Sequence, residues 1–159
     1  EHCFFRGADY FDHMRFLALV FTMIAFSGCG TLKTLTSPGI VKVLPHYLDA
    51  SGNHSDGPTL LHRDVYQRKL RTNPGLVHGV RYDVNWYAQG EVTLRLELRG
   101  SDPKPMKVEQ KISQDLNRTR WTSILIDGKT YRSLDQPDAW RISIWRGEEM
   151  LDEQTSLLW

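Results

Sequence analysis

Histidine and aspartate side chains gather in residues 46–64, and these residue types hold metals or move protons. An imidazole can serve as a metal ligand or as a general base. The segment therefore suggests a secreted metal-dependent or hydrolytic enzyme as one alternative function. Its histidines are eight residues apart, whereas zinc ligands usually come at shorter local spacings. The candidate ligands and bases are His46, Asp49, His54 and His62.

A calcium loop is a second candidate in the same segment. Asp49, Ser51 and Asn53 alternate as the ligands of such a loop do. The sixth position is His54 instead of the glycine that the turn needs, and the twelfth is Leu60 instead of a bidentate glutamate. The chain also contains no G-x-S-x-G nucleophile motif. The sequence therefore predicts no metal, no cofactor and no catalytic residue.

Arginine and tryptophan side chains suggest a surface that binds a partner. Both residue types are enriched at binding hot spots, so this surface is expected to bind a protein or a glycan. Alternatively, the arginines pair across strands with Glu97 or Asp83 and only solvate a sheet. The residues concerned are Arg81, Arg95, Arg99, Arg141 and Trp145.

The charge balance excludes one class of partner. The 159 residues include 20 Lys and Arg and 19 Asp and Glu, for a formal net charge of +1. A nucleic-acid-binding domain usually carries a clustered basic excess, so no nucleic acid is expected. The 40% of hydrophobic residues is typical of a globular domain.

Strands must position these side chains, because the dominant hydrophobic period from residue 40 onward is two. Residues 80–86 and 92–98 are apolar at every second position, which is typical of antiparallel strands with one buried face. Seven or eight such segments, with turn signals about ten residues apart, predict one all-β domain over 39–159. The expected architecture is an immunoglobulin-like antiparallel β-sandwich.

Further expectations concern the connections and the tryptophans. Residues 88–91 are expected to form a hairpin loop, and residues 129–131 to begin another strand. One short helix is expected over 64–71, with Leu61, Val65 and Tyr66 near one face, and the stop signal Asn73-Pro74-Gly75 follows it. Phase with apolar neighbours predicts that three tryptophans lie in the core: Trp86, Trp121 and Trp140.

The N-terminal part contains an unbroken apolar run over residues 16–26 (FLALVFTMIAF). Eleven helical residues rise about 16 Å, about half of the hydrocarbon core of a membrane. A basic residue, Arg15, precedes the run and small residues follow it, as in a signal peptide. Translation is expected to start at Met14. The alternative is a buried core helix, which would need the polar face that this run lacks.

Phe26-Ser27-Gly28-Cys29 resembles the lipobox of bacterial lipoproteins. The resemblance implies cleavage behind Ser27 and Gly28 and lipid on the Cys29 sulfur, so that the membrane is a partner through a lipid anchor. It divides the chain into the upstream residues and signal helix (1–28), a lipidated tether (29–38) and the domain (39–159). Gly30, in place of an aspartate, implies an outer-membrane lipoprotein that faces the periplasm or the cell surface.

The expected function is that of a lipid-anchored envelope protein acting as a non-catalytic binding or accessory module. Its partner would be an envelope protein or a glycan. The enzyme that uses residues 46–64 is one alternative. A structural envelope lipoprotein without a dedicated ligand is the other.

Overall fold

A computed structural model describes residues 37–100, 104–114, 118–134, 137 and 139–159. The expected signal helix, the cleavage residues Ser27 and Gly28, and Cys29 lie outside the described residues. Within the part that is described, no helix is long and apolar enough to cross a membrane.

The described residues form seven strands, two α-helices and one 3-10 turn. The strands are β1 (Gly39–Leu48), β2 (Gly79–Tyr87), β3 (Gly90–Arg99), β4 (Met106–Gln114), β5 (Arg120–Asp127), β6 (Ala139–Arg146) and β7 (Glu149–Thr155). The helical elements are α2 (Leu60–Thr72), η1 (Pro74–Leu76) and α3 (Gly128–Ser133).

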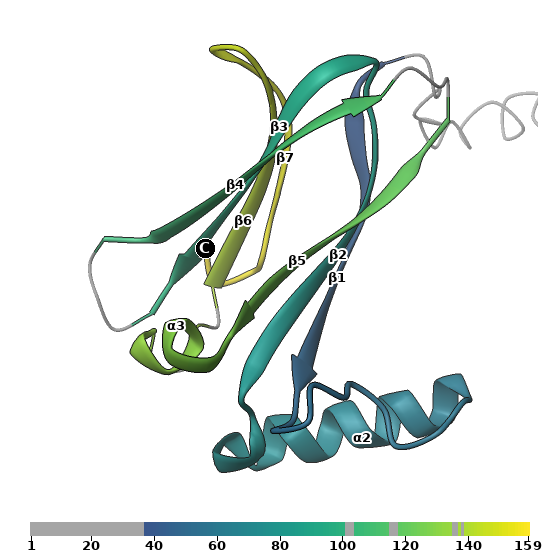
Figure 1. Cartoon of the computed structure of the whole chain (residues 1–159), viewed down its shortest axis with the longest axis vertical. Coiled ribbons are helices and arrows are strands. Elements are labelled where there is room, and N and C mark those ends of the chain that lie inside the picture. The colour runs from purple at the N-terminus through teal and green to yellow at the C-terminus, as the bar shows by residue number, and fades with distance from the viewer. Residues whose placement is uncertain (1–36, 101–103, 115–117, 135–136, 138) are drawn as a thin grey trace, which may run out of the picture. The chain divides into compact units, whose positions relative to one another are not determined.

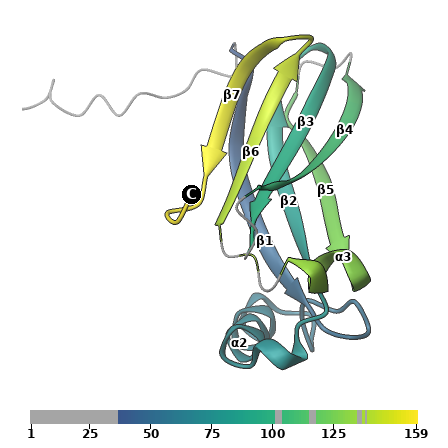
Figure 2. The same ribbon diagram turned by 90° about the vertical axis from the view of Figure 1, so that its left-hand side faces the viewer.

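The strands form two antiparallel sheets that face each other (Figure 1 and Figure 2). The three-stranded sheet has the order β1-β2-β5, and the four-stranded sheet has the order β4-β3-β6-β7. The immunoglobulin-like sandwich predicted from the sequence is confirmed. Its fourth strand pairs with β3, whereas the constant-domain arrangement places the fourth strand on the opposite sheet.

The core lies between the two sheets and follows the predicted alternation. The inward residues of β2 and β3 are all 2% exposed or less. Burial of these apolar side chains is the main stabilising term of the fold. The residues are Val80, Tyr82, Val84 and Trp86 on β2, and Val92, Leu94, Leu96 and Leu98 on β3.

Residues 88–91 do not form the predicted hairpin loop. Residues 88 and 89 carry the chain from β2 in one sheet to β3 in the other, and Gly90 and Glu91 already belong to β3. Ala88 in this connection is fully buried. The reason is that β2 already has a partner on each side, β1 and β5. Crossing to the second sheet also lets the apolar faces of β2 and β3 cover each other, which a hairpin in one sheet would not do.

Two further expectations are wrong for local reasons. Residues 129–131 lie in helix α3 and not in a strand, so seven strands are described. Trp121 is 52% exposed instead of buried, because β5 turns Thr122, Ile124 and Ile126 inward and the intervening positions must then point outward. Trp86 is fully buried and Trp140 packs against the core, as predicted.

Helix α2 begins four residues earlier than predicted and buries a different face. The hydroxyl of Thr59 caps it by accepting a hydrogen bond from the backbone N–H of His62 at 3.2 Å. Of the residues predicted to share the buried face, Tyr66 packs against the core, but Leu61 and Val65 are 72% and 55% exposed. The buried side chains are Gln67 and Leu70, because the helix contacts the sandwich at the end of β1.

Side chains complete the outer edge of β1. The Gln67 side chain accepts from the Tyr47 N–H at 2.8 Å and donates to the Tyr47 carbonyl at 2.9 Å, much as a neighbouring strand would. At the other end of β1, Asp152 accepts from the Ile40 N–H at 2.8 Å. Pro45 also lies on this edge strand, which is where a sheet tolerates proline. These features protect an exposed edge from pairing with another chain.

Candidate functional site

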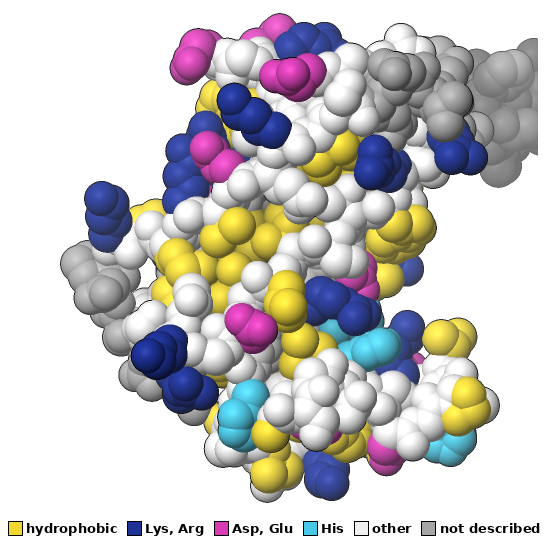
Figure 3. Space-filling view, viewed as in Figure 1, with side chains coloured by type: hydrophobic (Ala, Val, Ile, Leu, Met, Phe, Trp, Pro, Cys, Tyr) yellow, Lys and Arg dark blue, Asp and Glu magenta, His cyan; other side chains and the backbone are white. Residues whose placement is uncertain are grey.

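A groove of about 460 Å³ lies along the outer face of the three-stranded sheet, next to α2. We name it the α2 groove. Figure 3 shows a hollow beside α2, with histidine and basic side chains in it. Five parts of the chain supply the lining: Leu44 and His46 from β1, His54 from the following loop, Arg63 from α2, Arg81 and Asp83 from β2, and Trp121 and Ser123 from β5.

Strand register explains why these distant residues meet. Antiparallel pairing places His46 opposite Arg81 on β2. It also places Asp83 opposite Leu44 on one side and Ser123 on the other. Facing residues in adjacent strands project on the same side of a sheet. The side chains of His46 and Arg81 therefore lie beside those of Leu44, Asp83 and Ser123 on the outer face of the sheet.

The carboxylate of Asp83 is the centre of the hydrogen-bonding network in the groove. Ser123 donates its hydroxyl to Oδ1 at 2.6 Å. Arg81 donates to Oδ2 through Nη2 at 3.0 Å and Nε at 3.2 Å, and His46 Nε2 lies 3.4 Å from the same oxygen. The Asp83 side chain is only 18% exposed, so charge-assisted contacts hold it in place.

This arrangement differs from a nucleophilic triad. In a triad, the serine hydroxyl donates to an imidazole and the carboxylate orients that imidazole from behind. Here the Ser123 hydroxyl donates directly to Asp83. The network therefore fixes Arg81 and Ser123 in position instead of activating Ser123.

His46 and His54 form a pair of rings at the base of the groove. Their centroids are 5.2 Å apart, and His46 is only 7% exposed. Burial lowers the pKa of His46 below its ordinary value, against the opposing pull of Asp83. Burial, and then the charge of Arg81, also lowers the pKa of His54. Both effects favour neutral imidazoles at neutral pH.

We expect the stability of the fold to decrease on acidification because of this pair. The unfolded chain takes up a proton on His46 at its ordinary pKa of 6.5, whereas the folded chain does so only at lower pH. The stabilisation is therefore complete above that value and is lost as the pH falls through it towards the folded pKa. The melting temperature of wild type should drop between about pH 7.5 and about pH 5.5.

The variant His46→Gln should show a smaller drop over the same range, because it removes one of the two groups. The control His78→Gln changes an exposed histidine outside the groove and should keep the wild-type slope. A wild-type slope in His46→Gln would contradict the assignment to His46.

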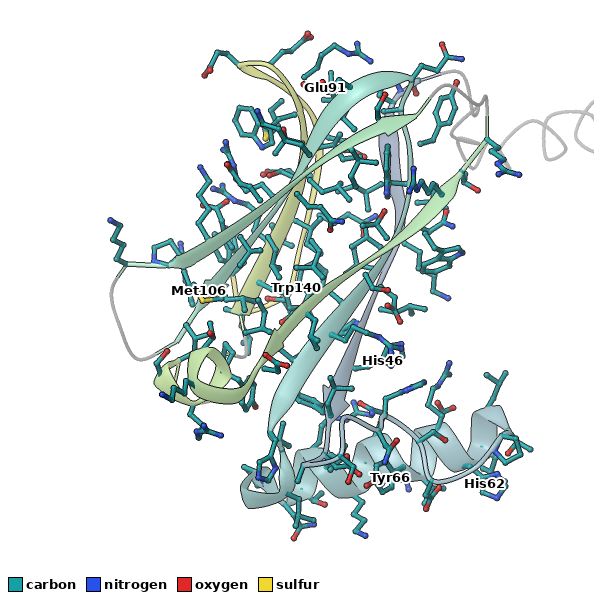
Figure 4. The ribbon with its side chains drawn as sticks, in the orientation of Figure 1. His46, His62, Tyr66, Glu91, Met106 and Trp140 are labelled. Carbon is teal, nitrogen blue, oxygen red and sulfur yellow. The ribbon has the colours of Figure 1, made fainter. Side chains whose placement is uncertain are left out.

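The structure separates the four candidate ligands of the 46–64 segment. His46 and His54 meet in the groove. Asp49 instead accepts from the Tyr66 hydroxyl at 2.7 Å, and the ring of His62 contacts the Thr59 hydroxyl at 2.8 Å. Figure 4 shows His62 near the beginning of α2, away from His46 on β1. Among the described residues, no group of three or more His, Cys, Asp or Glu could hold a metal ion.

The predicted partner face is divided between the two sheets. Arg81 lies in the α2 groove. The other members lie on β3 and β6 of the four-stranded sheet, where the Arg95 guanidinium stacks over the Trp145 ring at 4.1 Å. The remaining members are Arg99 and Arg141.

Ion pairs already engage the arginines of this second face. Arg95 contacts Glu109 at 2.8 Å, and Arg141 contacts Glu97 at 2.6 Å. Arg99 stacks over the Trp159 ring at 4.2 Å. On the other sheet, Arg81 contacts Asp83 at 3.0 Å. The Arg95–Glu109 and Arg141–Glu97 pairs join adjacent strands, as the alternative interpretation of the arginines expects. Arg81 and Asp83 lie on the same strand, so their pair is not a cross-strand one.

Sequence reasoning singled out His46, His54 and Arg81 in the groove, but it missed Arg63, Trp121 and Ser123 as site residues. A usable signal was present for the two residues on β5. Ile124 and Ile126 set the inward phase of that strand, and Trp121 and Ser123 have the opposite phase. No comparable signal identifies Arg63, since its position depends on how α2 packs.

In comparisons with models of protein families, with curated proteins and with solved structures, nothing matches this chain.

Proposed function

We propose that this protein is a lipid-anchored, non-catalytic binding module of the bacterial cell envelope. The α2 groove is the observation that carries the binding function. Its volume of about 460 Å³ falls in the range of small-molecule sites. Its lining is more polar than that of most such sites, and it includes fixed polar groups beside one exposed tryptophan. The lipobox-like residues 26–29 support the anchor.

The placement of the groove suits a protein tethered at its N-terminus. Strand β1 begins at Gly39, and α2 lies at the other end of this strand, near Tyr47 (Figure 1). Ten strand residues span about 33 Å. A tether joined at Gly39 would therefore attach the sandwich at the end opposite to α2 and the groove.

The hydrogen bonds that Asp83 accepts favour binding over catalysis. Asp83 is the one carboxylate among the described residues that line the groove, and Arg81 and Ser123 already occupy its oxygens. The Arg95–Trp145 face remains a proposed surface for an envelope protein or glycan. Arginines are ion-paired on this face as they are in the groove, so we place the principal ligand site in the groove because of its volume and its accessible Trp121.

The lipid anchor predicts a clear result in acyl-chain labelling. In a bacterial host supplied with a labelled fatty acid, wild type should incorporate label and Cys29→Ala should incorporate none, because the thioether needs the Cys29 sulfur. Cys3→Ala removes the other cysteine of the chain and should leave labelling unchanged. Label retained in Cys29→Ala, or absent from wild type, would contradict the anchor.

A further inference from the structure

The α2 groove offers more hydrogen-bond donors than acceptors. Asp83 is engaged with neighbours. The guanidinium groups of Arg63 and Arg81 can only donate; each uses Nε and Nη2 on a neighbouring aspartate and keeps its Nη1 hydrogens as further donors. In the described part of the chain, the indole N–H of Trp121 has no hydrogen-bond partner. A ligand that complements this lining must supply acceptor oxygens.

The groove carries an excess of positive charge. Two guanidinium groups face one carboxylate in the lining, and two imidazoles add positive charge when they are protonated. Arg63 also contacts Asp64 at 2.9 Å, but that pair is solvent-exposed, with the Asp64 side chain 64% exposed. Exposed pairs contribute little, so Arg63 can turn to a ligand at small cost. A negatively charged group is therefore the best match.

Trp121 gives the groove a flat apolar surface beside these donors. Its side chain is 52% exposed on a strand of the sheet, so the ring is held on a rigid element and still accessible. Apart from Trp121, the only apolar side chain of the described lining is Leu44. The groove thus lacks the continuous apolar lining that an acyl chain would need, but it fits a ring with one apolar face and a polar rim.

We propose that the α2 groove binds a saccharide that carries a carboxylate. The sugar ring stacks on Trp121, and the carboxylate faces Arg63 and Arg81. A sugar ring has the required apolar face and a rim of acceptor oxygens, and a guanidinium group matches a carboxylate in shape and charge. This inference rests on the proposed function, because it specifies the ligand of the same binding module.

The bound carboxylate would also make binding depend on pH. The groups facing His46 and His54 are Asp83 and Arg81 on β2 and Arg63 on α2. The negative charge of the ligand offsets the positive charge of the two arginines and therefore favours the protonated form of both imidazoles. The protonated imidazoles in turn strengthen the binding of the carboxylate. Affinity should therefore rise as the pH falls from about 7.5 to about 5.5.

Calorimetric titration of the full-length protein in detergent tests the proposal with three probes. The probes are α-1,4-linked trigalacturonate, the neutral trisaccharide maltotriose, and the acidic peptide triglutamate. Trigalacturonate should bind most tightly, and its affinity should fall as salt is raised, since the carboxylate contacts are partly exposed. Equal binding of triglutamate would overturn the saccharide, and equal binding of maltotriose would overturn the carboxylate.

Variants locate the site. Trp121→Ala should weaken trigalacturonate binding by about tenfold or more, as expected for a central aromatic contact, without unfolding the protein. Arg63→Gln should weaken it by about fivefold and reduce the salt dependence. Arg68→Gln, at an exposed position of α2 outside the groove, should change neither. Arg81 is left intact because its loss would free Asp83.

The remaining outcomes separate this proposal from the function on which it rests. No binding of trigalacturonate would overturn the proposed ligand, while the labelling of Cys29 still tests the anchor. Loss of binding in Trp145→Ala but not in Trp121→Ala would place the site on the four-stranded sheet. That result would overturn the groove as the ligand site but preserve a binding module.

Discussion

Trp86→Ala is expected to lower the free energy of unfolding by about 3–5 kcal/mol. The Trp86 side chain is fully buried between the sheets, and its indole N–H donates to the Thr122 hydroxyl at 2.9 Å. The substitution removes the largest side chain of the core and leaves a cavity that the surrounding strands cannot fill. Chemical denaturation followed by circular dichroism measures the loss.

Trp121→Ala is the matched control, because the same chemical change is made on the neighbouring strand. Trp121 is 52% exposed and should cost no more than about 0.5 kcal/mol, as is usual for surface positions. If Trp86→Ala does not fold, Trp86→Phe keeps the ring in the core and should lose about 1–2 kcal/mol with the hydrogen bond. Similar losses in Trp86→Ala and Trp121→Ala would contradict the outward phase of Trp121.

Gln67→Met is expected to destabilise the protein by about 2–4 kcal/mol, although methionine has a similar size. The side-chain amide of Gln67 makes three hydrogen bonds: two with the Tyr47 backbone and one, at 2.9 Å, to the His54 carbonyl. The residue is 6% exposed. Methionine would leave these backbone groups without a partner where water has little access, which is costly.

Hydrogen exchange distinguishes this loss from a general weakening of the fold. The Tyr47 amide should lose its protection in Gln67→Met, and the amides of α2 should exchange faster, because Gln67 joins the helix to β1. Gln110→Met changes an exposed residue of β4 and should leave both stability and exchange unchanged. Unaltered protection at Tyr47 would show that Gln67 does not complete the edge of β1.

The strands could be predicted because their signal is local. On β3, four apolar residues alternate with polar ones, and all four are 1% exposed or less. Alternation of this kind reports directly which side of a strand is buried. The same rule, applied to Ile124 and Ile126, would also have placed Trp121 outside. The opposite phase was also open, because Leu125 is apolar and shares the phase of Trp121, and both side chains are 52% exposed.

Pairing between strands was less predictable, because it depends on which surfaces must cover each other. Residues 88–91 have the length and the glycine of a hairpin loop, yet the chain passes between the two sheets at residues 88 and 89. Local turn chemistry permits both paths. The choice follows from the partners that β2 finds on both sides, and those partners lie up to 48 positions away along the chain, as in the pairs Gly39–Tyr87 and Gly79–Asp127.

The candidate site, like the fold, could be predicted only in part from the sequence. The sequence indicated that His46, Arg81 and the other polar residues of their strands would not be core residues. It offered Asp83 as a partner for an arginine, but it did not indicate that Asp83 would also hold Ser123, because that contact joins residues 40 positions apart. Arg63 reaches the groove only because Gln67 and Leu70 fix the buried face of α2.

By itself, the sequence determined the class of the fold, the inward faces of its strands and the lipobox-like segment at 26–29, since each depends on neighbouring residues. The tertiary structure alone decided which sheet receives each strand, how α2 docks against β1, and which side chains line the groove. These features arise from contacts between distant segments, and no periodicity in a single segment encodes them.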